Sequence, residues 1–128
     1  RSLEMDVLGD GVRVALRMLM ALTVVRDGTL CIEEPESHQH TSALPSLARA
    51  IVEGGKRSSV QVVATTHSLE LVRALADACV GAKRGFAAYH LERDPAGVVQ
   101  STRLDTLTLA HLNETGVDPR RLDEYARG

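Results

Sequence analysis

The chain has 128 residues, of which 44% are hydrophobic and 25% are charged, and this fits one soluble globular domain with a single core. Its formal net charge of −2 gives no case for binding nucleic acid or an anionic membrane through bulk electrostatics, although a local basic patch stays open. Aromatic residues make up only 2%, which argues against a surface on which single-stranded bases stack.

The first half of the chain alternates between predicted helices and strands. Residues 12–25 (VRVALRMLMALTVV) are apolar on almost every face, which predicts a helix that is buried on most sides. Residues 29–33 (TLCIE) and 60–66 (VQVVATT) are short, apolar and β-prone, as fully buried strands are.

Each of these strands is followed by a predicted helix. Thr41 or Ser42 can cap the second helix, which runs to about Glu53 and ends at Gly54-Gly55. Ser68 can cap the third helix. The apolar stripe of the second helix comprises Leu44, Leu47, Ala48 and Ile51, and that of the third comprises Leu69, Val72, Leu75 and Ala76.

After the third helix the pattern changes. Residues 85–92 and 98–104 flank the turn sequence 94–97 (DPAG), which predicts a β-hairpin. Residues 105–113 are predicted to be helical, and residues 119–127 to form a last short helix with a proline in its first turn.

This order of elements predicts an α/β fold with parallel central strands and a C-terminal β-hairpin. Ligands of such sheets bind outside the carboxyl ends of the strands. Two polar clusters, Glu33-Glu34 and Thr65 to Ser68, fall at those ends. The turn Leu8-Gly9-Asp10-Gly11, in front of the first helix, is a third candidate site.

The adjacent carboxylates of Glu33 and Glu34 point in opposite directions if the chain is extended. One of them can then hold a hydrated Mg²⁺ while the other acts on a water molecule as a base. Taken alone, the stretch favours a charged, solvated turn at the end of a strand over such a metal and water site.

The other two clusters each admit a phosphate-binding and a structural interpretation. His67 can donate a hydrogen bond to a terminal phosphate or to an attacking water molecule, but a capping turn with a partly buried histidine is the plainer explanation. The N–H groups at the start of helix 12–25, next to Gly9 and Gly11, favour a phosphate, but an N-terminal capping turn explains the glycines too.

In their order along the chain, the three clusters resemble the C-terminal half of an ABC-type ATPase domain, as found in transporter, SMC-like and OLD-like ATPases. The chain is most similar to small AAA-labelled prokaryotic ATPases whose Walker B segment ends in E-E-P-E, here residues 33–36. The resemblance covers roughly residues 5–75, and residues 85–128 fit the end of the same domain loosely. It implies a partial, three-layer P-loop NTPase fold and a nucleotide-dependent homodimer that hydrolyses ATP with Mg²⁺.

The turn in front of the first helix matches the signature motif of this family. Its common form is Leu-Ser-Gly-Gly-Gln, and residues 8–12 have Gly9, Asp10 and Val12 in place of the Ser, the first Gly and the Gln. The resemblance implies that this turn contacts the nucleotide of a facing subunit. The residues concerned are Leu8, Gly9, Asp10 and Gly11.

The clusters at the strand ends match the catalytic motifs. Residues 29–34 match Walker B, where the resemblance makes Glu33 the Mg²⁺-associated carboxylate and Glu34 the catalytic glutamate. His67 matches the switch histidine, a second catalytic residue. Residues 36–41 match the D-loop region, and its candidate residues are Glu36, Ser37 and His40.

One motif of the family is missing. No G-x-x-x-x-G-K-[ST] loop occurs in the 128 residues, and Gly54-Gly55-Lys56 lacks its spacing. Without that loop the chain lacks most of its affinity for a nucleotide, so we expect it to be inactive alone. A missing N-terminal half or a partner chain with Walker A would complete the site. Because the chain opens on Arg1 rather than on methionine, we expect a natural fragment, a processed chain or a trimmed one.

Two other functions stay open. A non-catalytic assembly or regulatory fragment would bind a partner chain that carries Walker A. A metal-dependent nuclease would rely on alternating histidines that share one face of a strand. Its candidate ligands are Glu33, Glu34, Glu36, His38 and His40. The process that the ATPase drives is not identified by the sequence, and a DNA-related partner is one candidate.

Cysteine usage and hydropathy indicate the compartment. Cys31 and Cys79 lie in apolar segments far apart in the sequence, which favours two buried thiols in a reducing compartment over a disulfide framework. Residues 12–25 contain two arginines and are too short to span a bilayer, and no signal peptide is visible. We therefore expect a cytoplasmic protein without a membrane partner.

Overall fold

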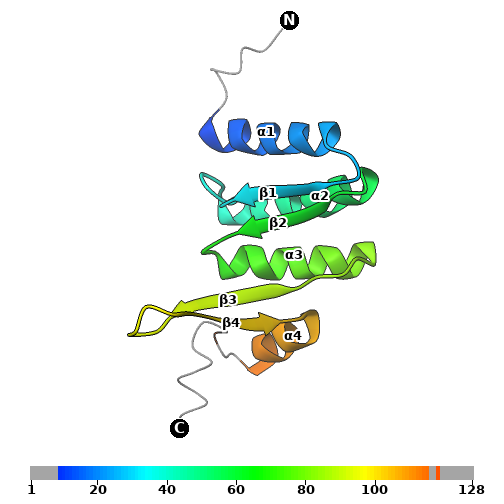
Figure 1. Ribbon diagram of the computed structural model, residues 1–128. Coiled ribbons are helices and arrows are strands. Elements are labelled where there is room, and N and C mark those ends of the chain that lie inside the picture. The colour runs from blue at the N-terminus through cyan, green and yellow to red at the C-terminus, as the bar shows by residue number, and fades with distance from the viewer. Residues whose placement is uncertain (1–8, 116–117, 119–128) are drawn as a thin grey trace, which may run out of the picture. The chain divides into compact units, whose positions relative to one another are not determined.

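The computed structural model describes residues 9–115 and residue 118, apart from the side chains of residues 112 and 113 (Figure 1). The chain divides into two compact units, residues 1–84 and residues 85–128. The last helix, predicted for residues 119–127, lies outside the described residues. None of the described helices is long and apolar enough to cross a membrane.

The first unit alternates between helices and strands around a parallel pair. Glu33, the last residue of β1, lies opposite Thr65, the last residue of β2, so the two carboxyl ends meet at one edge of the sheet. The predicted parallel pairing is confirmed. The elements are α1 (Asp10–Val24), β1 (Thr29–Glu33), the 3₁₀ turn η2 (Thr41–Ala43), α2 (Leu44–Arg57), β2 (Gln61–Thr65) and α3 (Leu69–Ala82).

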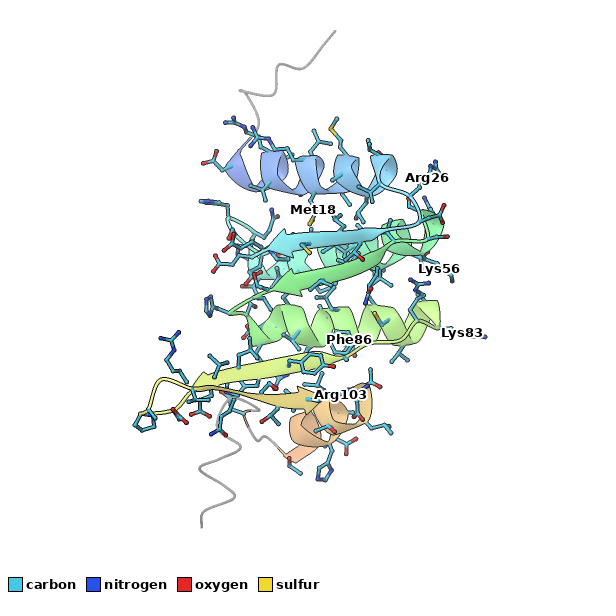
Figure 2. All side chains as sticks on the ribbon, viewed as in Figure 1. Met18, Arg26, Lys56, Lys83, Phe86 and Arg103 are labelled. Atoms are coloured by element: carbon cyan, nitrogen blue, oxygen red, sulfur yellow. The ribbon has the colours of Figure 1, made fainter. Side chains whose placement is uncertain are left out.

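The core of this unit lies between the three helices and one face of the sheet. Met18 reaches from α1 into it (Figure 2), and Ile32 and Val62 pack against it from the strands. Its central cluster consists of Met18, Leu44, Leu47, Ile51 and Leu71. The predicted stripe of α2 is confirmed, because all four of its residues are buried. The stripe predicted for α3 missed Leu71, which is fully buried because α3 packs along α2 through that side.

The opposite face of the sheet is open. Along both strands, partly buried residues alternate with exposed ones, and Cys31 and Val63 lie on the exposed side. The prediction of fully buried strands is therefore wrong, and of the two thiols predicted to be buried only that of Cys79 is. Parallel sheets are normally covered on both faces. The described residues of the first unit therefore supply the sheet and one helical layer of the three-layer arrangement. This is an α/β architecture consistent with a partial P-loop NTPase-like fold.

Helix α2 does not end at Gly54-Gly55, so that prediction is wrong. The helix continues to Arg57. A Cβ atom on Gly54 would lie 3.1 Å from Cδ1 of Leu22, and one on Gly55 would lie 3.2 Å from the carbonyl oxygen of Val60. The two glycines therefore let α2 approach α1 and the start of β2 closely, and they do not serve as a helix stop.

The start of α2 also differs from the prediction. A 3₁₀ turn at Thr41–Ala43 precedes it, and Nδ1 of His40, rather than a hydroxyl of Thr41 or Ser42, accepts the hydrogen bond from the Ser42 N–H at 3.2 Å. Ser68, in contrast, caps α3 as predicted, because its Oγ accepts from the N–H of Leu71 at 3.1 Å.

Helix α1 is less buried than its composition suggested. Met18 and Leu22 are its buried residues, whereas Val12 and Met20 are each 55% exposed and Val24 is 80% exposed. These exposed residues follow one another at intervals of four or eight positions and so share one face of the helix. Because α1 packs against the core along one side only, the prediction of burial on most sides is wrong.

The second unit contains the predicted hairpin. Strands β3 (Ala88–Arg93) and β4 (Val99–Leu104) pair in antiparallel fashion, and helix α4 (Thr106–Thr115) follows. In the turn, Gly97 has a φ of 84°, and the Asp94 carboxylate accepts from the Val98 N–H at 2.9 Å. This turn needs a residue that tolerates the left-handed region, which is why glycine stands there.

Candidate functional site at the carboxyl ends of the parallel strands

The chain turns sharply where β1 ends. Glu33 is exposed, and the following residue, Glu34, has a φ of 43°, in the left-handed region that non-glycine residues rarely adopt. The N–H of Glu34 still donates to the carbonyl of Thr65 at 2.9 Å, which extends the pairing of the strands by one residue. Pro35 is fully buried behind the turn and anchors it. The backbone strain at Glu34 is thus held by its surroundings, as is common at functional sites.

The structure brings Glu34 and His67 together. Nε2 of His67 lies 3.4 Å from Oε1 of Glu34, which is an ion pair when the imidazole is protonated. The His67 side chain is 92% exposed and that of Glu34 is 45% exposed, so both are accessible from solution. The two residues predicted to be catalytic therefore lie side by side, accessible to solvent, at the shared edge of two strands.

Glu36 connects the two strand ends, a contact that the sequence did not predict. Its Oε1 accepts a hydrogen bond from the Thr66 hydroxyl and another, at 3.2 Å, from the N–H of His67. Its Oε2 is buried and has no hydrogen-bond partner among the described residues. Glu36 thus faces the turn that carries His67 rather than only the solvent. The sequence signal for this contact was the threonine directly before His67.

Glu33 is placed so that it can contribute to a cation site. It is the exposed last residue of β1, and Glu34 follows it directly in the chain. No group of three or more His, Cys, Asp or Glu side chains within the described chain is arranged to hold a metal. One or two carboxylate oxygens at an open edge fit Mg²⁺, which keeps its waters and is shared with substrate phosphates, better than a metal held by protein ligands alone.

The turn before α1 is connected to the segment after β1. Leu8 lies outside the described residues, while Gly9 and Asp10 are exposed. The Gln39 side chain donates from Nε2 to the carbonyl oxygen of Gly11 at 2.5 Å. A Cβ atom on Gly11 would collide with the carbonyl oxygen of His38. The glycine at position 11 is therefore required by a contact within the chain, and Gln39 is a residue that the sequence did not single out.

The remaining residues of segment 36–41 hold the turn. Ser37 Oγ donates to Oε2 of Glu34 at 3.3 Å, and Nδ1 of His40 lies 2.8 Å from the Ser42 hydroxyl. His38 has a φ of 63° and sits in a turn. His38 and His40 therefore do not share one face of a strand, so the geometric basis of the nuclease interpretation is wrong.

Lys56 of the Gly-Gly-Lys stretch has a structural role. It lies within α2, and its Nζ donates to the carbonyl oxygen of Ala82 at 3.1 Å, at the C-terminal end of α3. A lysine at this position satisfies a free carbonyl and complements the negative end of the helix dipole. The stretch is not a phosphate loop, in agreement with its spacing.

Comparison with known proteins identifies the family. The chain is 34% identical over 65 residues to the uncharacterized protein MJECL11 of Methanocaldococcus jannaschii, an alignment that covers 51% of this chain and 57% of that protein. The chain therefore spans less than two thirds of the length of this relative. Residues 1–73 match the family described as "AAA domain, putative AbiEii toxin, Type IV TA system". This match includes β1, β2 and both strand ends that carry Glu34 and His67, and the chain belongs to this family of AAA domains.

Proposed function

We propose that the chain forms the hydrolytic part of an ATPase, with Glu34 as the base that activates water and His67 as the group that contacts the terminal phosphate. The observation that carries the proposal is the approach of Nε2 of His67 to Oε1 of Glu34, 3.4 Å, at the shared carboxyl edge of two parallel strands. Ligands of α/β sheets bind at this edge.

The two side chains suit these roles by their exposure. A carboxylate that is half accessible can take the proton of an attacking water molecule, a contribution of about 10²- to 10⁴-fold to the rate. The neighbouring imidazole is almost fully exposed and is free to turn toward a phosphate. Glu33 would supply an oxygen to Mg²⁺, which when bound neutralises charge on the phosphates.

A complete site needs a phosphate-binding loop, and the 128-residue sequence contains no G-x-x-x-x-G-K-[ST] motif. We propose that another segment of the same polypeptide or a partner chain supplies it. The open face of the sheet supports this, since exposed Cys31 and Val63 lie where a parallel sheet is normally covered. We further propose a nucleotide-dependent homodimer in which the turn Gly9 to Gly11 serves the nucleotide of the second copy.

The test is ATP hydrolysis by the polypeptide or complex that supplies the phosphate loop. Glu34→Gln removes the base and keeps the shape, so kcat should fall at least about 100-fold while ATP still binds. Glu92→Gln, the same change at an exposed glutamate of the second unit, is the matched control. Unchanged turnover in Glu34→Gln would refute the role of Glu34.

A non-catalytic assembly role is the second candidate. The exposed apolar face of α1, with Val12, Met20 and Val24, favours it, because such a face is normally covered by another protein surface. The 128-residue chain should then self-associate, or bind the chain that carries the phosphate loop, with Met20 protected from solvent. Sedimentation as a stable, well-behaved monomer that does not bind the loop-bearing chain would argue against this role.

A further inference from the structure

We propose that Glu36 is a positioning residue for hydrolysis: its carboxylate fixes the turn that carries His67, and thereby sets the distance between His67 and Glu34. The inference rests on the proposed function, because it assigns Glu36 a role in the reaction of that site. Glu36 itself touches neither the Glu34 carboxylate nor the His67 imidazole through a hydrogen bond or an ion pair within the described residues. It acts through the Thr66 hydroxyl and the backbone of His67.

The contacts of Glu36 cross from one strand end to the other. It lies in the turn after β1, and Oε1 accepts from the Thr66 hydroxyl and from the N–H of His67, both beyond the end of β2. Thr66 and His67 lie beyond the backbone pairing of β1 and β2, which ends with the hydrogen bond from the Glu34 N–H to the Thr65 carbonyl. The Glu36 carboxylate therefore connects the two strand ends beyond the last backbone hydrogen bond between the strands.

Thr66 connects Glu36 to the start of α3 through hydrogen bonds. Its Oγ1, which donates to Glu36, accepts from the N–H of Ser68 at 2.9 Å. Ser68 in turn caps α3 through the N–H of Leu71, and Leu71 is fully buried in the core. The turn of residues 66–68 is thus held between a carboxylate on one side and a buried helix on the other, which leaves the His67 backbone little freedom.

Glu36 is partly buried, and the burial of its Oε2 atom argues against an incidental surface contact. Oε2 is buried without a hydrogen-bond partner among the described residues, and a buried unpaired carboxylate oxygen costs free energy. A solvated turn residue would avoid this cost by rotating outward. The inward orientation of Glu36 is explained if the hydrogen bonds of Oε1 to Thr66 and His67 outweigh this cost.

The first experiment measures the position of the turn without nucleotide. In the 128-residue chain, amide hydrogen exchange of His67 should accelerate about tenfold or more in Glu36→Ala, because its N–H loses its acceptor. Glu92→Ala, at an exposed glutamate, should leave it unchanged. Thermal melting of each variant reports whether it folds, and Thr66→Val, which keeps shape and loses the hydroxyl, serves as a milder second variant. An unchanged exchange rate of His67 in Glu36→Ala would overturn the proposal.

The second experiment measures ATP hydrolysis in the form of the protein that supplies the phosphate loop. Misplacement of a reacting group costs up to about 100-fold, so Glu36→Ala and Thr66→Val should each lower kcat about tenfold to 100-fold with KM for ATP changed less than about twofold. Thr66→Ser keeps the hydroxyl and should retain most of kcat. The double variant should be no slower than Glu36→Ala, because both changes break the same connection.

The outcomes separate this inference from the proposed function. If Glu34→Gln abolishes turnover while Glu36→Ala and Thr66→Val hydrolyse ATP normally, the positioning role is wrong and the proposed function stands. A purely structural role of Glu36 would lower kcat, raise KM and lower the melting temperature together in Glu36→Ala, and Thr66→Ser would be as slow as Thr66→Val. That outcome would overturn the inference. If Glu34→Gln leaves turnover unchanged, the proposed function is refuted and the positioning role with it.

Discussion

Nε2 of His67 lies 3.4 Å from Oε1 of Glu34, although the two residues belong to different strand ends separated by a whole helix. The parallel register creates this proximity, because it places Glu33 opposite Thr65 and so ends both strands at one edge. The chain then continues into two tight turns. The turn after β1 has Glu34 at a φ of 43°, so a strained residue takes part in the exposed contact between Glu34 and His67.

The strain at Glu34 predicts a trade-off between stability and activity. A left-handed conformation costs a non-glycine residue roughly 1–2 kcal/mol, so Glu34→Gly should leave the free energy of unfolding unchanged or raise it by about 1 kcal/mol while it removes hydrolysis. Urea denaturation and an ATPase assay measure the two effects. Lys83→Gly is the matched control, since Lys83 has a φ of 53° at the C-terminal cap of α3 and lies outside the site. It should stabilise the chain without changing turnover. A loss of more than about 1 kcal/mol in Glu34→Gly would show that its side-chain contacts outweigh the strain.

The contact at Gly11 predicts a difference between two neighbouring glycines. A Cβ atom on Gly11 would collide with the His38 carbonyl, whereas one on Gly9 would meet nothing within 4 Å. Gly11→Ala should therefore lower the free energy of unfolding by about 1–3 kcal/mol, as overpacking does, and Gly9→Ala by less than about 0.5 kcal/mol. Urea denaturation of both variants measures this. Equal stabilities would mean that the turn and segment 38–40 are not held together.

The two cysteines should differ in reactivity. Cys31 is exposed, while Cys79 is 8% exposed and burial raises the pKa of its thiol, an effect that nearby Arg84 partly offsets. A raised pKa leaves less thiolate at neutral pH, so iodoacetamide should alkylate Cys31 at least about tenfold faster. Mass spectrometry of Cys31→Ser and Cys79→Ser separates the two rates. Faster alkylation of Cys79 would contradict its burial.

The same alkylation reports on the open face of the sheet. If a further layer covers that face when the phosphate loop is supplied, the alkylation rate of Cys31 should fall on assembly while that of Cys79 stays low. A Cys31 rate that is equal before and after assembly would place the added segment elsewhere.

The cap of α4 predicts a pH dependence in the second unit. The Asp105 carboxylate accepts from the N–H of Thr108 at 2.8 Å, and this bond and the Thr108 hydroxyl hold the pKa of Asp105 below its ordinary value. Because the folded-state pKa is lowered, the stabilisation of α4 is complete above the ordinary pKa of an aspartate and is lost as the pH falls through the lowered one. Amide exchange of Thr108 measured by NMR should follow this course. In Asp105→Asn, which can cap but does not titrate, the change should disappear.

Local pattern predicted most of the elements and the core of α2. The stripe of Leu44, Leu47 and Ile51 is buried as expected, because helical periodicity directly records which side faces the core. Periodicity could not predict that α2 runs through Gly54-Gly55. Whether a glycine ends a helix or lets a neighbour approach depends on Leu22 and Val60, which are adjacent only in the fold.

By itself, the sequence determined the element types, the parallel pairing and the position of Glu34 and His67 at strand ends, because these depend on short-range spacing and on the rule that strands joined by one helix run parallel. It also shows that no G-x-x-x-x-G-K-[ST] motif occurs in these 128 residues. Only the tertiary structure decided that Glu36 turns inward to Thr66 and His67, that Gln39 contacts Gly11, and that one face of α1 and of the sheet stays exposed. These features depend on contacts between residues that are distant in the sequence. In turns, no repeating pattern of residues indicates which side chains will meet, and packing of the whole unit decides it.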